Sequence, residues 1–529
     1  MIDALLPSRL SVDWHVTSQR RRLTLLAAGA LVASIFYAWL VILSPIASPL
    51  TLFTWLGVAT IAWRPRVGLY FAFVMVLLFE AGNADQMMAP GAYFMGGLSS
   101  MVGLPGVIAS PLELLLLLTF GFWLAKGVAR RKLDFRGGRL QWPMIVFLVF
   151  LVAGLLRGVL SGGDLNIALW ESRFLFYIVI CYFLATNTIR EPQHVRQLLA
   201  LSLVAMGLWA IEGAYRRIAL IDTGLLGVVP EFAYAHETVV FLGVLILLIV
   251  AQQVFGASLW LRLCGLALLP VAIYTLLATE RRAGYIAVMI AFLALSVVFL
   301  FAKRKAFFLI TVPVLIVVAI YLPHFWNDTS MLGQPARAVR SLREPDPRDA
   351  ASNMYRELEK INVRYTIQAN PVLGVGFGRQ FLFVVGLPDL SWWAFWHYEP
   401  HHNILWIWLK IGAGGFIAFF TLMGAALARA GHLARHLHAP EGRVAAVLAL
   451  TSITASLVFS YVDLGLTAAR IPVLLGTTIG ALAVLDHLPW PARAARPSSP
   501  AGGAGLRPGT APAPRRTYFP PPLGEGVRG

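Results

Sequence analysis

Apolar runs of about twenty residues recur along this sequence, and they constrain its fold more than any other feature. A run of this length, folded as a helix, is long enough to span a bilayer. Hydrophobic residues make up 58% of the chain and charged residues only 13%. So few charged residues could not cover so much apolar surface in water. The expected solvent for most of the chain is therefore lipid, which predicts an all-α polytopic integral membrane protein.

We predict about fourteen transmembrane helices from these runs. The first lacks a small-residue cleavage site, so we expect a retained helix rather than a signal peptide. Loop charges orient the helices, because Lys and Arg accumulate on the cytoplasmic side. With the arginines of residues 20–22 inside, nearly every dense basic cluster falls in the cytoplasm, so the net charge of +17 requires no nucleic-acid partner. The predicted spans are 23–43, 47–63, 67–80, 109–127, 141–160, 173–188, 195–214, 237–255, 260–279, 283–302, 306–322, 402–428, 444–463 and 470–486.

The spans divide the chain into five expected parts. Within the large outer loop, residues 350–369 should form a helix whose apolar stripe, Met354, Leu358, Ile361 and Tyr365, lies on the membrane surface. The tail is too poor in apolar residues to fold, so we expect it to be disordered. The parts are a cytoplasmic N-terminus (1–22), transmembrane helices 1–11 (23–322), the large outer loop (323–401), transmembrane helices 12–14 (402–486) and a Pro-rich cytoplasmic tail (487–529).

Arginines on the outer side break the positive-inside pattern and are the first candidates for function. Arg281 and Arg282 lie in a turn so short that both guanidinium groups must be near the outer interface. They could extend to lipid phosphates or pair with loop carboxylates. Alternatively, their planar forks could bind an anionic ligand such as the diphosphate of a lipid carrier. The other arginines expected on this side are Arg173, Arg216, Arg217 and Arg470, together with Arg337, Arg340, Arg343, Arg348, Arg356, Arg364 and Arg379 of the large loop.

Histidines cluster where the large loop enters the twelfth predicted helix, at His397, His401 and His402. Histidine exchanges protons near neutral pH, and Glu399 is close enough in sequence to orient one ring. Helix capping is the structural alternative. A zinc site is a further alternative, but the spacing matches no zinc motif, so no metal is expected.

Alternating glycines follow the predicted loop helix and include Gly374 and Gly376. Glycines let a backbone approach a ligand closely, although a bare turn explains them equally well. Their spacing is not that of a nucleotide-binding fingerprint, and no cofactor is expected.

These features, in this order, resemble the O-antigen ligase and O-antigen polymerase family of bacterial envelope glycosyltransferases. The resemblance extends from about Ala278 to Phe420. In it, Arg282-Ala283-Gly284 opens a helix, and Arg364 precedes Asn370-Pro371-Val372-Leu373-Gly374-Val375-Gly376 in a long outer loop. His402-Asn403 then leads into the next helix. The resemblance implies a lipid-dependent (GT-C-like) fold in the bacterial inner membrane, with a large helical loop and an active face in the periplasm.

The resemblance also implies a metal-independent, inverting glycosyltransferase without a cofactor. Its donor would be a glycan linked to undecaprenyl diphosphate, transferred en bloc to a hydroxyl of a glycan or of the lipid A core. Such transfer serves O-antigen, lipopolysaccharide or exopolysaccharide biosynthesis, in which other assembly proteins would be partners. By position, His402 matches the catalytic base, and Arg282 and Arg364 match the diphosphate-binding arginines, with Arg281 as a basic neighbour. The expected supporting residues are His401, Glu399, His397, Gly374 and Gly376.

Three alternatives stay open. The enzyme could be a repeat-unit polymerase of O-antigen or exopolysaccharide instead of a ligase. A lipid-glycan flippase also has many helices, but such transporters usually show related halves and short loops. A non-catalytic scaffold of a polysaccharide complex would not depend on its histidines.

Overall fold

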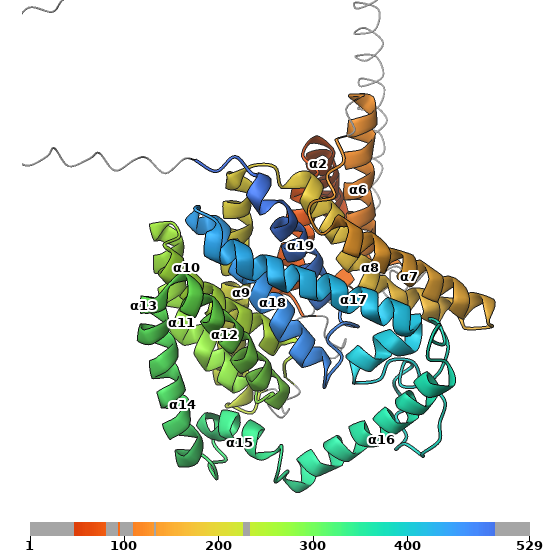
Figure 1. The fold of residues 1–529 in the computed structure, drawn as a ribbon, viewed down its shortest axis with the longest axis vertical. Helices are drawn as coiled ribbons and strands as arrows, with labels where there is room; N and C mark the ends of the chain where they lie inside the picture. Colours follow the sequence, from red (N-terminus) through yellow and green to blue (C-terminus); the bar gives the residue numbers. More distant parts are fainter. Residues whose placement is uncertain (1–46, 81–93, 96–108, 132–133, 226–232, 492–529) are drawn as a thin grey trace, which may run out of the picture. The chain divides into compact units, whose positions relative to one another are not determined.

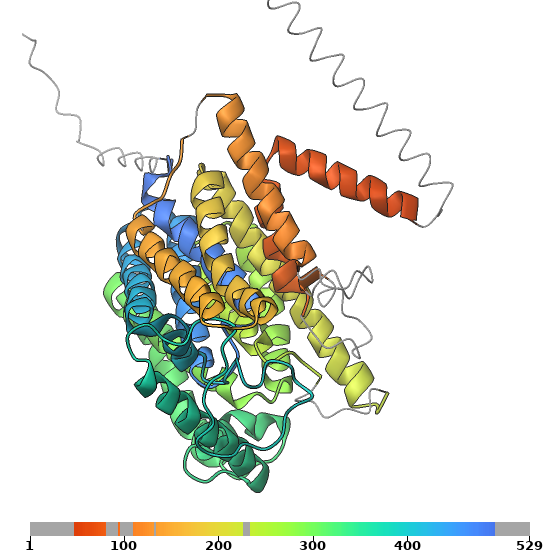
Figure 2. The same ribbon diagram turned by 90° about the vertical axis from the view of Figure 1, so that its right-hand side faces the viewer.

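The computed structural model describes residues 47–80, 94–95, 109–131, 134–225 and 233–491. In these ranges the chain forms helices and turns without any strand, and all but Pro491 belong to one compact unit (Figure 1 and Figure 2). The predicted cytoplasmic N-terminus, the first predicted span and the tail beyond residue 491 lie outside the described residues.

The protein is an all-α polytopic membrane protein. Within the described ranges, ten helices are long and apolar enough to cross a bilayer, while the full number of spans stays a prediction. The ten are α6 (Pro111–Ala129), α7 (Gln141–Leu160), α8 (Leu165–Thr188), α9 (Pro192–Tyr215) continued by η1 (Arg216–Ile221), α10 (Thr238–Phe255), α11 (Leu259–Ala278), α12 (Arg282–Ala302), α13 (Arg304–Ala306) continued by η3 (Phe307–Thr311) and α14 (Val312–His324), α17 (Asn403–His436) and α18 (Pro440–Ser460). Shorter apolar helices are α2 (Ala47–Trp63), α3 (Arg66–Leu78) and α19 (Arg470–Val484), which η5 (Leu485–His487) follows.

One predicted span begins earlier than its hydropathy suggested. α8 starts at Leu165 rather than at residue 173, after Asp164 caps it by accepting a hydrogen bond from the Ile167 amide. Its first turns carry Glu171 and Arg173, which interrupt the apolar run. Both side chains are nevertheless buried, because each has a partner of opposite charge. Glu171 pairs with Lys410 of α17, and Arg173 pairs with Glu113 of α6.

The centre of the bundle is built from closely packed helices with small side chains. α18 contacts α9, α10, α12, α17 and α19. α19 packs along α8, where a Cβ added to Gly476 would lie 2.5 Å from the carbonyl oxygen of Ile178. Gly476 and Gly480, four residues apart, therefore let two helix backbones approach as small residues do in other membrane bundles.

The large loop lies at one end of this bundle in both views (Figure 1 and Figure 2). It contains η4 (Met331–Gly333), α15 (Gln334–Arg340) and α16 (Pro347–Ala369). Asn362 on the inner side of α16 accepts hydrogen bonds from the amides of Val384 and Val385, which anchors the segment that follows. The predicted helix at residues 350–369 is thus present and begins slightly earlier.

The apolar stripe of α16 faces away from the rest of the protein. Met354, Ile361 and Tyr365 are 64%, 47% and 49% exposed. Contact of this stripe with the membrane surface stays a prediction.

Candidate active site

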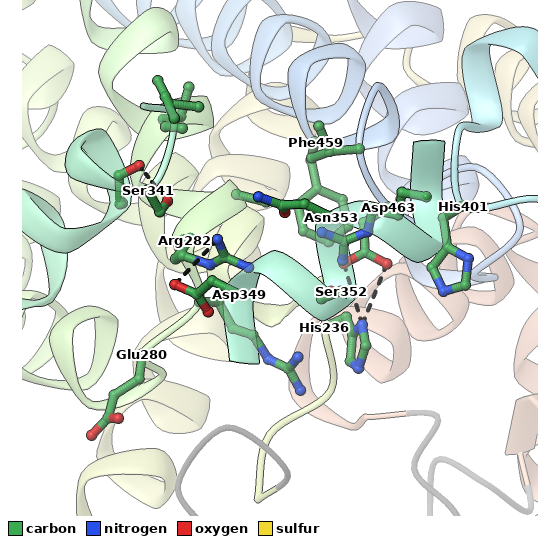
Figure 3. Close-up of a pocket in the computed structure, with 17 residues that line it drawn as sticks. His236, Glu280, Arg282, Ser341, Asp349, Ser352, Asn353, His401, Phe459 and Asp463 are labelled. Atoms are coloured by element: carbon green, nitrogen blue, oxygen red, sulfur yellow. Dashed lines mark hydrogen bonds and ion pairs between the residues drawn. The ribbon is translucent and has the colours of Figure 1, made fainter. Parts of the chain in front are cut away.

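A cavity of about 400 Å³ lies beside the N-terminus of α12, a volume suited to a small ligand (Figure 3). Its walls come from segments far apart in the sequence, all predicted to be on the outer side of the membrane. They are the turn before α10 (His236), the turn before α12 (Glu280 and Arg281), the start of α12, parts of α15 and α16, His401, the end of α18 (Phe459), and the chain after α18 that includes Asp463.

Three arginines line this cavity: Arg281, Arg282 and Arg356. Nη1 of Arg282 lies 3.3 Å from a carboxylate oxygen of Asp349, while Nη2 of Arg281 lies 3.4 Å from the carbonyl oxygen of Tyr234. Such a group of guanidinium groups in a half-buried cavity is suited to an anion with several oxygens.

The turn that carries Arg281 and Arg282 is held in an uncommon conformation. Glu280 has a φ of 53°, in the left-handed region that a residue with a side chain rarely adopts. Its carboxylate is 2.8 Å from Nη1 of Arg217, which ties the turn to η1. This ion pair helps to fix the backbone from which both arginines project.

Arg364 does not line the cavity. It is exposed on α16, whereas Arg356 on the same helix reaches the cavity wall. The structure therefore brings Arg281 and Arg282 together with Arg356, not with Arg364. The sequence does contain a pattern that could have identified Arg356. One polar stripe at helical spacing faces the cavity, and it consists of Asp349, Ser352, Asn353 and Arg356.

Other arginines that are predicted on the outer side have structural partners. Arg216 pairs with Glu80 at 2.9 Å and with Glu212 at 2.8 Å. Arg470 is fully buried, where it lies 3.2 Å from Glu237 and donates to the carbonyl oxygen of Val76. For these residues the ion-pair interpretation describes the structure.

His401 lines the cavity and is oriented by a buried carboxylate (Figure 3). Its Nδ1 lies 3.2 and 3.3 Å from the two carboxylate oxygens of Glu359, whose side chain is only 1% exposed, and its backbone amide donates to the same group. A neutral imidazole that donates its Nδ1 proton to Glu359 keeps a lone pair on Nε2. His401 therefore has the arrangement of a general base.

His402 has a different environment. It caps α17, since its Nδ1 accepts a hydrogen bond from the Leu405 amide at 3.2 Å, and its ring packs on Tyr461. Burial, together with Lys360 and Arg364, lowers the pKa of His402 to about 4. The neutral ring then carries its proton on Nε2, which leaves no lone pair for a substrate. The geometry favours the capping interpretation for His402.

Glu399 and His397 also lie away from the cavity lining. Glu399 is buried near Glu171 and Lys410, and burial followed by the nearby Glu171 raises its pKa well above the usual range. His397 packs against Trp396 and Phe383. The carboxylate that orients a histidine ring at the cavity is Glu359, which is remote in sequence, and not Glu399.

Gly374 and Gly376 are explained by backbone packing. The Gly376 amide donates to the carbonyl oxygen of Lys410, and a Cβ on Gly376, whose φ is 87°, would lie 2.3 Å from the Gly158 amide nitrogen. Gly412 breaks α17 with a φ of 68°, and the Ala413 amide donates to the Pro371 carbonyl oxygen. The segment fills a break between helices and does not line the cavity.

A second imidazole–carboxylate pair lines the cavity and has no signal in the sequence. Nδ1 of His236 lies 3.3 Å from both carboxylate oxygens of Asp463, which is 227 residues away in the chain. Burial alone would raise the pKa of Asp463, but the nearby His236, Arg356 and His401 lower it below the ordinary value. Among the described residues, no group of three or more His, Cys, Asp or Glu side chains is arranged to hold a metal ion.

Comparison with known proteins connects this cavity to one family. Residues 266–420 match the model of the family described as O-antigen ligase. The matched segment contains Arg281, Arg282, Arg356, Glu359 and His401, whereas His236 and Asp463 lie outside it. No curated protein matches the chain significantly.

Proposed function

We propose that the chain is a glycosyltransferase of the bacterial inner membrane, because residues 266–420 match the model of the O-antigen ligase family. It transfers a glycan en bloc from undecaprenyl diphosphate to an acceptor hydroxyl on the periplasmic side. The observation that carries this proposal is the presence of Arg281, Arg282, Arg356 and the oriented imidazole of His401 around one cavity.

The arginines act on the leaving group. When the bond between the anomeric carbon and the phosphate oxygen breaks, its electron pair passes to the departing diphosphate. Guanidinium groups fixed at that position stabilise the developing charge more than they stabilise the ground state. Because Arg282 and Arg356 are each near a buried carboxylate, they are held in place before the donor binds.

His401 acts on the acceptor. Its Nε2 takes the proton of the acceptor hydroxyl as that oxygen forms a bond to the anomeric carbon from the face opposite the diphosphate. Glu359 orients the ring and stabilises the imidazolium that results. We therefore propose His401 as the base in place of His402, and Arg356 in place of Arg364 as a diphosphate-binding residue.

Transfer by the purified protein tests this proposal. The protein in lipid nanodiscs, supplied with a glycan on undecaprenyl diphosphate and an acceptor, should release undecaprenyl diphosphate and form product in excess chelator. A strict requirement for a divalent metal would contradict the metal-independent reaction. Normal polysaccharide production in cells that carry His401→Ala would favour a non-catalytic scaffold.

Product size in a deletion strain distinguishes a ligase from a polymerase. Long glycans that accumulate on the carrier lipid would identify a ligase, because polymerisation continues without it. Glycans of a single repeat unit would identify a polymerase. In either case, expression of the wild-type gene should restore the parental product.

A further inference from the structure

The cavity contains an imidazole that the proposed reaction does not use. His236 precedes α10, and its side chain is 46% exposed where it borders the cavity. In the view of Figure 3 it lies between the Arg282–Asp349 pair and His401. It therefore borders the space that the proposed donor occupies.

Asp463 fixes the orientation of this ring. Because Nδ1 of His236 is 3.3 Å from both oxygens of a buried carboxylate, Nδ1 carries a proton and donates it. Asp463 also accepts a hydrogen bond from the Leu464 amide and lies 3.8 Å from Nη2 of Arg356. The ring is thus held with Nε2 as its remaining polar atom.

We propose that His236, held by Asp463, binds the diphosphate of the donor as an imidazolium through Nε2–H. This inference rests on the proposed function and adds a fourth cation to Arg281, Arg282 and Arg356. Protonation converts Nε2 from an acceptor, which would face phosphate oxygens unfavourably, into a charge-assisted donor. A base is already provided by His401, so a second neutral imidazole is not required for the acceptor hydroxyl.

Charged groups from every neighbouring element affect this protonation. Asp463 and the donor diphosphate favour the imidazolium, whereas the arginines oppose it. The groups around the cavity are Asp463, Arg356, Glu280, Arg281, His401 and the Arg282–Asp349 pair. Diphosphate binding should therefore depend on pH in the range in which histidines titrate.

Binding of farnesyl diphosphate to the purified full-length protein tests the proposal. At about pH 6, His236→Ala should weaken binding about tenfold, the usual contribution of one charge-assisted hydrogen bond. At about pH 8 the difference from wild type should be smaller, because a ring that has lost its Nε2 proton no longer donates to the phosphate oxygens. His236→Asn should behave like His236→Ala, since its amide can still donate to Asp463 but has no distal nitrogen. It also serves as the variant that preserves the local fold.

Two controls complete the design. His436→Ala, at the exposed far end of α17, should leave binding unchanged at both pH values. Glycan transfer by the wild-type protein is measured separately, so that failure of the proposed function is distinguished from failure of this inference. Equal losses at both pH values, or no loss at about pH 6, would overturn the role of His236 even if transfer proceeds normally.

Discussion

At the residue scale, His401 and His402 are adjacent in the sequence but their ring nitrogens have different partners. Nδ1 of His401 faces the Glu359 carboxylate, whereas Nδ1 of His402 accepts from a backbone amide. We expect His401→Ala to lower the transfer rate by about 10² to 10⁴, the usual contribution of a general base. His402→Asn, which keeps a capping side chain, should retain most activity. Initial rates with purified variants check this, and the opposite order would restore His402 as the base.

Arg282 and Arg364 also differ in their surroundings, because Arg282 lines the cavity and Arg364 does not. Arg282→Lys should reduce transfer by about 10² or more, because a point charge does not reproduce the two-pronged contact with phosphate oxygens. Arg364→Ala should change the rate less than about threefold, since the side chain is exposed and outside the cavity lining. A severe loss in Arg364→Ala, with unchanged folding by size-exclusion chromatography, would contradict this assignment.

The pKa of His402 predicts an acid-dependent loss of stability. The pKa is about 4 in the folded protein, below the ordinary value of 6.5, so the unfolded chain binds the proton more readily between these values. Acidification from about pH 7 to about pH 4.5 should therefore destabilise the fold through His402 by about 1 to 3 kcal/mol. Thermal unfolding of His402→Asn should depend less on pH over this window. Equal acid sensitivity in both proteins would show that His402 does not contribute.

The sequence predicted some cavity residues and missed others for a physical reason. Arg281 and Arg282 could be placed at the outer interface because a very short turn leaves them nowhere else to lie. Glu359 and Asp463 could not be paired with their histidines, since these contacts join residues 42 and 227 positions apart. Arg364 and His402 were predicted by their position in a motif; neither lines the cavity, and the transfer rates of their variants test the roles predicted for them.

At the element scale, α16 has two faces with opposite roles. Its polar stripe, which includes Asp349 and Arg356, faces the cavity, while Met354, Ile361 and Tyr365 are exposed on the other side. Helical periodicity alone predicted the apolar stripe, and the same periodicity applied to polar residues would have found the cavity face. The start of α8 was missed because buried, paired charges do not contribute to an apolar run.

The close contact between α8 and α19 makes a prediction about stability. Gly476→Ala should destabilise the protein by about 1 to 3 kcal/mol, because the new Cβ would overlap the Ile178 carbonyl oxygen on α8. Gly424→Ala is the matched control: it is also a helical glycine, but its Cβ would meet nothing within 4 Å. The control should be neutral or slightly stabilising, by up to about 1 kcal/mol. Melting temperatures in detergent that fall equally for both variants would contradict close packing at Gly476.

At the scale of the whole molecule, the segments that line the cavity are all predicted to lie on one side of the membrane. The segments that border the cavity are those that the distribution of Lys and Arg predicts to be outside the cytoplasm. The all-α membrane fold followed from the apolar runs, because the requirement for backbone hydrogen bonds in lipid leaves few alternatives. Which side chains converge between the helices depends on packing that hydropathy does not encode.

The convergence of the arginines and His401 on one donor is tested most directly by a structure of the protein with a glycan-linked isoprenoid diphosphate, determined by electron cryo-microscopy in nanodiscs. We expect diphosphate density among Arg281, Arg282 and Arg356, with the first sugar of the glycan within reach of Nε2 of His401. Diphosphate density at a different end of the bundle, with this cavity left empty at saturating ligand, would contradict it.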